Sequence, residues 1–320
     1  MKIAVLIPCY NEAATIKKVI DDFRSELPEA MIYVCDNNSK DDTAKIARAN
    51  GAIVLTEPRQ GKGNVVRSLF QDIDADVYVM IDGDDTYPAV FAHKMIQLVA
   101  DKQADMVLGD RISNGAYGKE NKRAFHGFGN NLVRRLINML FKSEVSDIMT
   151  GYRVFNRYFV KTFPVLSKGF EIETEMTIFS LHNNYKVREV HIDYRDRPEG
   201  SVSKLNTYTD GIKVLKIVFT LFKDYKPLAF FSTLGLLFCV IGLVIGAPAV
   251  LEYMELGYIW KVPSTILAAS LEIIGLLLLA CGLILDTTVK HQKMLHEQQA
   301  ILFKYIESKT HQAQSDKIIF

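Results

Sequence analysis

Apolar runs and amphipathic stretches alternate along roughly the first 195 residues of the chain. Short apolar runs rich in β-branched residues predict strands at Ile3–Ile7, Ile32–Cys35, Ile53–Leu55, Val77–Ile81 and Met106–Leu108. Segments with helical spacing predict helices between them, over Ala13–Ser25, Asp42–Ala49, Asn64–Ile73 and Ala89–Ala100. This alternation predicts an α/β domain with a doubly wound, mostly parallel sheet and helices on both faces.

Polar side chains follow several of the predicted strands. The strand ends carry Asn11-Glu12, Asp36, Asp82-Gly83-Asp84 with Asp85 behind it, and Asp110-Arg111. Ligands of open α/β sheets bind at the carboxyl ends of the strands, so these side chains predict a site along one sheet edge. Neighbouring carboxylates repel each other, and a hard cation such as Mg²⁺ or Mn²⁺ bound to substrate phosphates relieves that repulsion. An isolated Asp-x-Asp also occurs on solvated turns. The prediction of a metal site therefore depends on the other polar strand ends as well.

Two long apolar segments lie near the C-terminus. Leu228–Val250 has no charged residue, and Ser264–Leu285 has Glu272 as its only charge. Each is about 20 residues long, which is enough to cross the hydrocarbon core of a bilayer. The pattern predicts a transmembrane hairpin, with a pair of core helices in a soluble protein as the alternative. Glu272 is predicted to pair between subunits or to face a partner protein.

The distribution of lysines predicts the orientation of this hairpin. Lysines flank its two outer ends, at Lys213, Lys216, Lys223, Lys226, Lys290 and Lys293. The connecting loop has only Lys261 against Glu252 and Glu255. Because positive charge favours the cytoplasmic side, the N-terminal domain and both termini are predicted to lie in the cytoplasm.

The remaining C-terminal segments allow more than one interpretation. Tyr208–Tyr225 places apolar residues at helical spacing among lysines, which suits an amphipathic helix on an anionic membrane or a helix packed on the domain. The polar tail after Asp286 is predicted to form a coil between subunits or a frayed end. We therefore divide the chain into a domain (1–207), an interface helix (208–226), two spans (227–286) and a helical tail (287–320).

Composition narrows the class of protein. The 320 residues carry a formal net charge of +1, so no overall field favours nucleic acid as a partner. The four cysteines follow no disulfide or zinc spacing, which indicates reduced, buried thiols. The apolar run at the N-terminus is too short for a signal peptide and is predicted to be the first strand.

A glycine-rich segment, Arg59-Gln60-Gly61-Lys62-Gly63-Asn64, lies at the start of a predicted helix. Glycines at this place allow backbone N–H groups to approach a phosphate closely. The spacing is not that of a P-loop. The alternative is a glycine-rich turn with a solvated lysine.

Three ordered motifs in the first 85 residues resemble the family-2 glycosyltransferases, which have the GT-A fold. The first strand end is similar to their IPxYNE, the second ends in Asp36 followed by polar residues and a DxT, and the D-x-D follows. The resemblance implies a nucleotide pocket lined by Pro8, Tyr10 and Glu12, with Asp36 approaching the base. The residues alone also allow Asp36 to cap a turn and Glu12 to complement a helix dipole.

Motifs in the second half resemble one branch of that family. The glycine-rich segment is similar to the RxGKGxA of the dolichyl-phosphate-mannose-synthase branch. Asp147-Ile148-Met149-Thr150-Gly151-Tyr152-Arg153 resembles its DxxSGFR, Phe170-Glu171-Ile172-Glu173 its acceptor-side F-x-x-E, and the segment Tyr194–Leu205 its R-x-x-G-x-S-K. Together with the hairpin, these motifs resemble the polyprenyl-phosphate glycosyltransferases of the bacterial GtrB type.

This resemblance implies a reaction between two anionic substrates, a nucleotide-diphosphate sugar and a polyprenyl phosphate. Asp84, with Asp82, would hold Mg²⁺ or Mn²⁺ at the leaving diphosphate. The donor side would comprise Pro8, Tyr10, Glu12, Asp36, Lys62, Asp82 and Asp84. The acceptor phosphate would be bound by Arg111, Arg123, Arg195, Arg197, Ser203 and Lys204, because arginine forks suit phosphate oxygens. Each of these arginines could instead form a surface ion pair.

A phosphate acceptor changes the need for a base. A phosphate monoester has its second pKa near 6, so it is mostly ionised at neutral pH and needs orientation more than deprotonation. Asp84, Asp147 and Arg111 are the predicted catalytic residues, with Asp147 read as an orienting residue or, alternatively, as the base. The family is inverting, which implies a single in-line displacement at the anomeric carbon.

Several expectations about substrates and partners follow from the resemblance alone. The donor is expected to be UDP-glucose or UDP-N-acetylglucosamine, and the acceptor undecaprenyl phosphate in a bacterial inner membrane. A homotetramer and a partner flippase or downstream transferase are expected. The alternatives are a processive or hydroxyl-acceptor polysaccharide glycosyltransferase and a non-catalytic membrane scaffold that binds nucleotide sugars. The only tryptophan is Trp260, so the Q-x-x-R-W of processive synthases is missing.

Overall fold

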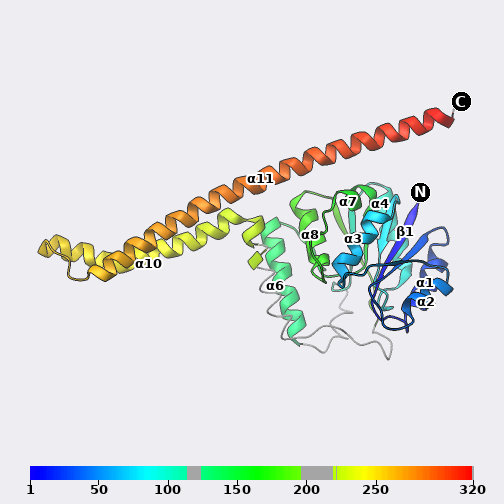
Figure 1. The fold of residues 1–320 in the computed structure, drawn as a ribbon, viewed down its shortest axis with the longest axis horizontal. Coiled ribbons are helices and arrows are strands. Elements are labelled where there is room, and N and C mark those ends of the chain that lie inside the picture. Colours follow the sequence, from blue (N-terminus) through cyan, green and yellow to red (C-terminus); the bar gives the residue numbers. More distant parts are fainter. Residues whose placement is uncertain (114–123, 196–218, 221, 319–320) are drawn as a thin grey trace. The chain divides into compact units, whose positions relative to one another are not determined.

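One mixed sheet organises the N-terminal part of the protein. The computed structural model describes residues 1–113, 124–195, 219–220 and 222–318. Within them a seven-stranded sheet has the order β3-β2-β1-β4-β6-β5-β7 (Figure 1). Its strands are β1 (Ile3–Cys9), β2 (Met31–Asp36), β3 (Ile53–Thr56), β4 (Val77–Met80), β5 (Met106–Asp110), β6 (Arg153–Asn156) and β7 (Val187–His191).

The apolar runs predicted the first five strands, and the structure confirms them. β6 and β7 were not predicted as strands. β6 has only four residues and is almost wholly buried, and so short a run does not reveal its period. β6 runs antiparallel between β4 and β5, with Arg153 opposite both Met80 and Leu108. The chain therefore enters β6 at the carboxyl ends of β4 and β5, and residues 147–152 arrive beside the acidic loop.

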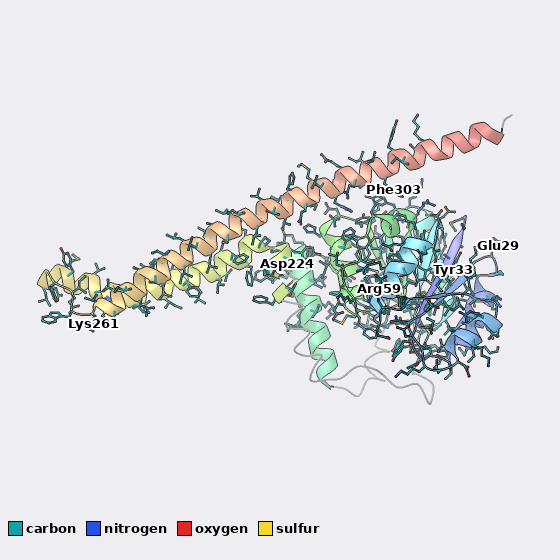
Figure 2. The ribbon with its side chains drawn as sticks, in the orientation of Figure 1. Glu29, Tyr33, Arg59, Asp224, Lys261 and Phe303 are labelled. Carbon is teal, nitrogen blue, oxygen red and sulfur yellow. The ribbon has the colours of Figure 1, made fainter. Side chains whose placement is uncertain are left out.

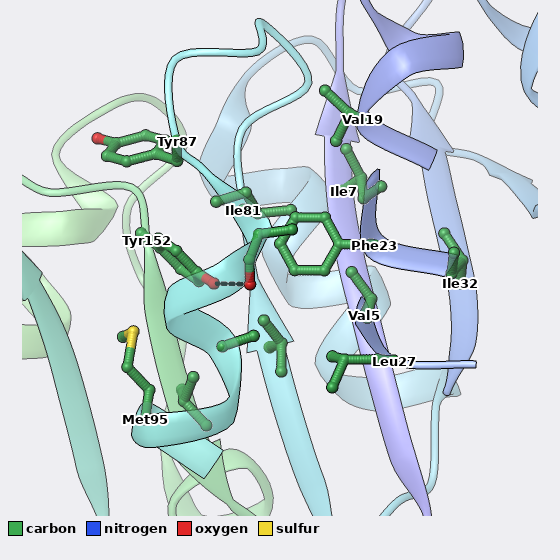
Figure 3. Packing of buried hydrophobic residues seen from close by; sticks show 14 of the residues in the cluster. Val5, Ile7, Val19, Phe23, Leu27, Ile32, Ile81, Tyr87, Met95 and Tyr152 are labelled. Carbon is green, nitrogen blue, oxygen red and sulfur yellow. Dashed lines mark hydrogen bonds between the residues drawn. The ribbon is translucent and has the colours of Figure 1, made fainter. Parts of the chain in front are cut away.

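Helices cover both faces of the sheet. The helices of this unit are α1 (Ile16–Glu26), α2 (Thr43–Ala49), α3 (Lys62–Asp72), η1 (Ala89–Phe91), α4 (Ala92–Ala100), α7 (Arg157–Thr162) and α8 (Ile172–His182), and α6 (Ala124–Phe141) packs on α8 (Figure 1). Alternate side chains of a strand point to opposite faces. Val5 and Ile7 of β1 and Phe23 of α1 belong to a cluster of buried side chains that extends to Met95 of α4 (Figure 3). The Tyr152 hydroxyl in the same cluster donates to the Ala89 carbonyl at 3.4 Å.

Aromatic rings fill a second cluster around β6 and α7. Phe155 of β6 stacks on Phe159 of α7 with centroids 4.9 Å apart, and Phe159 stacks in turn on Phe163 at 5.3 Å. Phe70 of α3 meets Phe155 edge-on at 5.6 Å, and Phe179 of α8 meets Phe163 edge-on at 5.0 Å. Such rings bury large apolar areas in preferred geometries, so they fix α3 and α8 relative to the sheet.

The register of the central strands aligns the polar strand ends. Cys9 of β1 lies opposite Asp36 of β2, and the Cys9 carbonyl accepts a hydrogen bond from the Asn37 amide at 2.9 Å. The Ile81 amide, just past β4, donates to the Leu6 carbonyl at 3.0 Å. The segments after β1, β2 and β4 therefore leave the sheet next to one another.

A second compact unit, residues 212–298, contains one long apolar helix and most of another, whose end beyond residue 298 belongs to the first unit. α10 spans Pro227–Leu256 and α11 spans Val262–Ile318, and both are long and apolar enough to cross a membrane. Only 11% and 17% of their most apolar windows are buried, whereas helices in a soluble core would be mostly covered. Lys261 lies in the short turn between them (Figure 2).

Small residues let the two helices of this hairpin approach closely. A Cβ added at Gly275 of α11 would lie 2.3 Å from the Cys239 sulfur, and one at Gly235 of α10 would lie 2.7 Å from the Gly275 carbonyl oxygen. Glu272 faces the same contact, because its Oε1 would lie 2.8 Å from a Cβ added at Gly242. The Glu272 carboxyl is thus directed at α10 of its own chain.

The segments flanking the spans differ in how far the structure describes them. α11 continues without a break past Asp286, so the tail up to Ile318 is helical, and its pairing as a coil between subunits stays a prediction. The helix extends because the tail has strong helix formers and no glycine or proline to end it. Most of the predicted interface helix, 208–218 and 221, lies outside the described residues, and the division into domains stays a prediction.

Candidate functional site

A pocket of about 340 Å³ opens at the carboxyl ends of β1 and β4. It contains six of the predicted donor-side residues together with neighbours from β1, β2 and the start of α3. The lining residues are Pro8, Cys9, Tyr10, Glu12, Asn37, Gln60, Gly61, Lys62, Val65, Asp82, Gly83, Asp84 and Phe170. Polar groups from separate strand ends therefore meet in one cavity, as the strand pattern predicted.

Hydrogen bonds and close packing hold the acidic loop after β4, residues 82–85, in place. The Gly83 carbonyl accepts a hydrogen bond from the Thr15 hydroxyl at 2.6 Å, and a Cβ at Gly83 would lie 2.7 Å from the Cys9 sulfur. Asp84 is buried, and its Oδ1 accepts the Thr86 hydroxyl at 2.7 Å and the Thr86 amide at 3.3 Å. The loop thus presents both Asp82 and Asp84 to the pocket in a fixed arrangement.

Lys62, the first residue of α3, lies between two carboxylates. Its Nζ is 2.5 Å from Oδ1 of Asp82 and 2.5 Å from Oε1 of Glu173. Burial alone would lower the pKa of Lys62, but the charges of Asp82 and Glu173 outweigh that effect and raise it. For Glu173, burial raises the pKa, although the positive charge of Lys62 acts in the opposite direction. A charged lysine therefore sits at the wall of the pocket next to a proposed metal ligand.

The glycines around Lys62 serve contacts within the chain. The Gly63 amide donates to the Lys168 carbonyl at 3.1 Å, and the Gly61 amide donates to the Asn37 side chain at 2.6 Å. A Cβ at Gly61 or Gly63 would lie 2.1 Å from the carbonyl oxygen of Lys168 or Ser167 respectively. The Gly61 and Gly63 amides are therefore both bound to protein oxygens, and the approach of a phosphate to other N–H groups of this segment stays a prediction.

Asn37 ties the second strand end to the glycine-rich segment. Its side-chain NH₂ donates to the carbonyls of Glu57 and Arg59, each at 2.8 Å, while its oxygen accepts from the Gly61 amide. The sequence pattern predicts a role for its neighbour Asp36 but not for Asn37. The sequence does contain a signal for Asn37, because an asparagine directly after a strand-end aspartate can both donate hydrogen bonds to a neighbouring loop and accept them from it.

Asp36 is buried at the end of β2 but does not line the pocket. Its Oδ2 accepts the Ser39 amide at 3.3 Å. Its Oδ1 is buried without a hydrogen-bond partner among the described residues. Buried carboxylate oxygens are normally paired, so this atom marks a position where a ligand donor would be favourable.

Arg111 and Asp147 form a buried pair next to the acidic loop. Arg111 donates from Nε to Oδ2 of Asp147 at 2.7 Å and from Nη2 to Oδ1 at 3.0 Å. Its Nη1 donates to the Tyr87 hydroxyl at 2.9 Å. The guanidinium also lies 5.7 Å from the Tyr87 ring centre and 5.4 Å from that of Tyr194. Arg111 and Asp147 do not line the pocket, so the structure does not bring them together with Asp82 and Asp84 in that cavity.

Tyr87 links this pair to the acidic loop. Its hydroxyl oxygen also accepts the Gly151 amide at 3.0 Å, and a Cβ added at Gly151 would lie 2.2 Å from Oδ2 of Asp82. Burial raises the pKa of Tyr87, against the opposing effect of Arg111, so the phenol stays neutral. Sequence reasoning missed Tyr87, because a single aromatic after an acidic run has no distinctive spacing.

The predicted acceptor residues are described only in part. Arg195 pairs with Asp85 at 3.3 Å and with Asp22 at 3.6 Å, and its amide donates to the Thr86 carbonyl at 2.9 Å. The contact of the Arg195 amide with Thr86 ties the start of the segment similar to R-x-x-G-x-S-K to the acidic loop. The other predicted phosphate ligands, Arg123, Arg197, Ser203 and Lys204, lie outside the described residues.

The donor set suits a hard divalent cation that arrives with its substrate. The described residues contain no group of three His, Cys, Asp or Glu side chains placed to hold an ion. Mg²⁺ is usually bound through one or two carboxylates, with waters and substrate phosphates completing the shell. Asp82 and Asp84 supply two carboxylates at the pocket, which fits an ion shared with a diphosphate better than an ion held by protein alone.

The sheet order and the acidic loop at the end of β4 define a GT-A-type α/β protein. The chain matches the family model "Glycosyl transferase family 2" over residues 4–163. It is 32% identical over 301 residues to "Glycosyltransferase AglJ" of Haloferax volcanii, covering 93% of this chain and 95% of the relative. The chain belongs to glycosyl transferase family 2, and it is a glycosyltransferase.

Further relatives and solved structures agree with this assignment. The chain is 32% identical to "Dolichyl-phosphate hexose transferase" of Haloferax volcanii, covering 68% of this chain and 92% of the relative. "Protein RfbJ" of Shigella flexneri is 57% identical over 35% of this chain and 88% of its own length. The fold resembles glucosyl-3-phosphoglycerate synthase from Mycobacterium tuberculosis solved with Mn²⁺ and UDP-glucose, with a TM-score of 0.55 and 21% identity over 69% of this chain and 79% of that chain.

Proposed function

We propose that this protein transfers a hexose from a nucleotide-diphosphate sugar to a polyprenyl phosphate in the membrane. The observation that carries the proposal is the pocket in which Asp82, Asp84, Glu12 and Lys62 meet at the strand ends. Three carboxylates and one ammonium suit a diphosphate bridged to a divalent cation. The Mn²⁺ and UDP-glucose in the complex of the structural neighbour support this choice of ligands.

The donor binds, in this proposal, in the pocket between β1 and β4. Pro8, Tyr10 and Glu12 line the nucleotide part, and Asp36 with its unpaired buried oxygen approaches the base. Asp82 and Asp84 would hold Mg²⁺ or Mn²⁺, which supplies positive charge to the leaving diphosphate. UDP-glucose or UDP-N-acetylglucosamine is the proposed donor.

A lipid phosphate is the proposed acceptor. The two long apolar helices would hold the enzyme at the membrane where such a lipid resides, and the name of the relative from Haloferax volcanii supports the same acceptor class. Undecaprenyl phosphate is the proposed lipid. Arg111, Arg123, Arg195, Arg197, Ser203 and Lys204 are proposed to bind its phosphate, because several cations are needed where two anionic substrates meet.

The proposed reaction is one in-line displacement. An oxygen of the acceptor phosphate bonds to the anomeric carbon, and the bond from that carbon to the donor diphosphate breaks, which inverts the configuration. A phosphate monoester is mostly ionised at neutral pH, so the attacking oxygen has no proton to lose. Both oxygens of Asp147 contact Arg111, which supports an orienting role for Asp147 rather than that of a base.

The placement in the cell is part of the same proposal. The enzyme is proposed to lie in a bacterial inner membrane with two spans, and with the catalytic domain and both termini in the cytoplasm, where nucleotide sugars are made. It would act as a homotetramer, and its lipid-linked sugar would pass to a flippase or a downstream transferase.

An acceptor-dependence assay tests the proposal. The purified full-length protein is incubated with Mn²⁺ and a panel of UDP- and GDP-sugars, with or without undecaprenyl phosphate. We expect release of nucleoside diphosphate from one donor only when the lipid phosphate is present, and no release by Asp84→Asn. Equal release with a sugar hydroxyl acceptor in place of the lipid would favour a polysaccharide glycosyltransferase. Full function of Asp84→Asn would favour a scaffold.

A further inference from the structure

The position of Lys62 conflicts with simple metal binding at Asp82. The ammonium lies 2.5 Å from Asp82 and is 9% exposed, so it occupies one oxygen of a carboxylate that the metal would need. Glu173 holds the same ammonium at 2.5 Å and is itself 7% exposed. Glu173 does not line the pocket, whereas Asp82 does. Lys62 therefore has one buried partner, Glu173, and a second partner, Asp82, that lines the pocket.

Lys62 also breaks a local rule of helix formation. It is the first residue of α3, and the positive end of the helix dipole disfavours a cation there. No acidic residue lies in the first turn of α3, and Gly61 offers no side-chain cap. Asp82 and Glu173 are the carboxylates that compensate this placement. Positions where a sequence departs from local preference are often functional.

Charge decides how this cluster responds to ligands. A divalent cation that enters alone meets an ammonium on Asp82 and is repelled by it. A cation that enters with a nucleotide diphosphate brings negative phosphate groups, which attract the ammonium away from Asp82. Lysine suits such a move, since its charge sits at the end of a flexible stem with three donors.

We propose that Lys62 occupies Asp82 until substrate enters, and that Glu173 is a positioning residue that holds Lys62 when it leaves Asp82, so that metal binding depends on the donor. This coupling rests on the proposed function and gives Lys62 two successive partners at the same site. In the unloaded enzyme Lys62 bridges Glu173 and Asp82. When the cation and the diphosphate bind together, Lys62 stays on Glu173, turns to the diphosphate and frees Asp82 for the cation.

Manganese binding without turnover tests this coupling. Mn²⁺ affinity of the full-length protein is measured by electron paramagnetic resonance of free Mn²⁺, with and without UDP, for the wild type, Lys62→Met and Glu173→Gln. Lys17→Met, an exposed lysine on α1, is the control. We expect UDP to tighten Mn²⁺ binding at least about tenfold in the wild type and the control, a common size for coupling between sites. Lys62→Met should bind Mn²⁺ alone about tenfold more tightly and lose most of the UDP effect.

Glu173→Gln gives an independent result if Lys62→Met does not fold. Without its anchor, Lys62 should remain on Asp82, so Mn²⁺ binding alone should stay weak and the UDP effect should shrink. Unchanged or weaker Mn²⁺ binding by folded Lys62→Met overturns the inference, as does an undiminished UDP effect in Glu173→Gln. Asp84→Asn separates the two proposals: if it leaves Mn²⁺ binding intact, the metal site itself is misassigned, whatever Lys62 does.

Discussion

Single residues set how closely separate segments approach the acidic loop. Gly151 touches Asp82, Gly83 touches Cys9, and in each case a Cβ would come within 2.7 Å of the neighbouring atom. Neither glycine has a positive φ, so the requirement is for space rather than for backbone freedom. The Asp82 carboxylate is thus held by Lys62 on one side and limited by Gly151 on another.

Replacing Gly151 by alanine should misplace Asp82. The new Cβ would lie 2.2 Å from Oδ2, so the carboxylate must move, and overpacking of this kind typically costs about 1–3 kcal/mol. We expect kcat/KM for donor to fall at least about tenfold, which corresponds to a transition-state loss of about 1.4 kcal/mol. Gly169→Ala is the matched control, because its Cβ would meet only the flexible Glu171 side chain. Equal activity of both variants would contradict a role for this contact.

Replacing Asp147 by asparagine distinguishes an orienting residue from a base. The buried Arg111 would lose one of its two carboxylate contacts, and breaking such a pair costs about 3 kcal/mol of folding free energy. We expect lower turnover and a lower melting temperature with an unchanged shape of the pH–rate profile. Glu189→Gln, which loosens the contacts to the Ser146 and Asp147 amides, should act in the same direction but less strongly. Loss of one limb of the pH profile in Asp147→Asn would instead identify a base.

At the scale of elements, the segment between β3 and α3 positions one wall of the pocket. Glu57, just after β3, accepts the Arg59 amide and Nε, each at 2.8 Å, and also accepts the Ser68 hydroxyl of α3. Asn37 holds the same segment from β2. The wall is therefore built from hydrogen bonds among three elements rather than from apolar packing.

The folding stability of the protein should fall in acid as Glu57 becomes protonated. Hydrogen bonds from Arg59, against opposing burial, lower the pKa of Glu57 to about 2, below its usual value near 4.3. The stabilisation is therefore complete above about pH 4.3 and is lost as the pH falls towards 2. Because Arg59 is solvent-exposed, we expect about 1–2 kcal/mol rather than the full shift.

Melting of Glu57→Gln and wild type at pH 6 and about pH 3 measures this contribution. The variant should be less stable at pH 6, and the gap between the two proteins should narrow at the lower pH. Glu171→Gln, directly before α8, serves as the control because Glu171 takes no part in the hydrogen bonds that Glu57 accepts from Arg59 and Ser68. A gap that stays constant with pH would contradict the assignment.

At the scale of the whole molecule, the chain divides into an α/β unit and a helical hairpin. The hairpin is long, apolar and little buried, which is the pattern of helices that face lipid. Its interior contacts rely on glycines and on Cys239, as close packing of helices in membranes usually does. The α/β unit contains the pocket by itself, so the proposed role of the hairpin is to bring that pocket to a lipid acceptor.

Reporter fusions test the predicted orientation of the hairpin. Alkaline phosphatase fused after Tyr258, in the turn between α10 and α11, should be active because the turn is predicted to lie outside the cytoplasm. The same reporter fused after Phe320 should be inactive, and green fluorescent protein should give the opposite pattern at both positions. Phosphatase activity at the C-terminus would mean that the orientation is opposite to the predicted one or that one of the two helices does not span the membrane.

The sequence by itself determined the class of fold, the acidic strand ends and the two apolar helices. These features follow from local periodicity and from the rule that parallel strands end on one edge, so neighbouring residues suffice to predict them. Only the tertiary structure decided which side chains meet there. β6 enters antiparallel beside β4 and brings Asp147 to Arg111 and Gly151 to Asp82, while α8 brings Glu173 to Lys62. Such contacts join segments far apart in the chain, and no local pattern encodes them because they depend on how the elements pack.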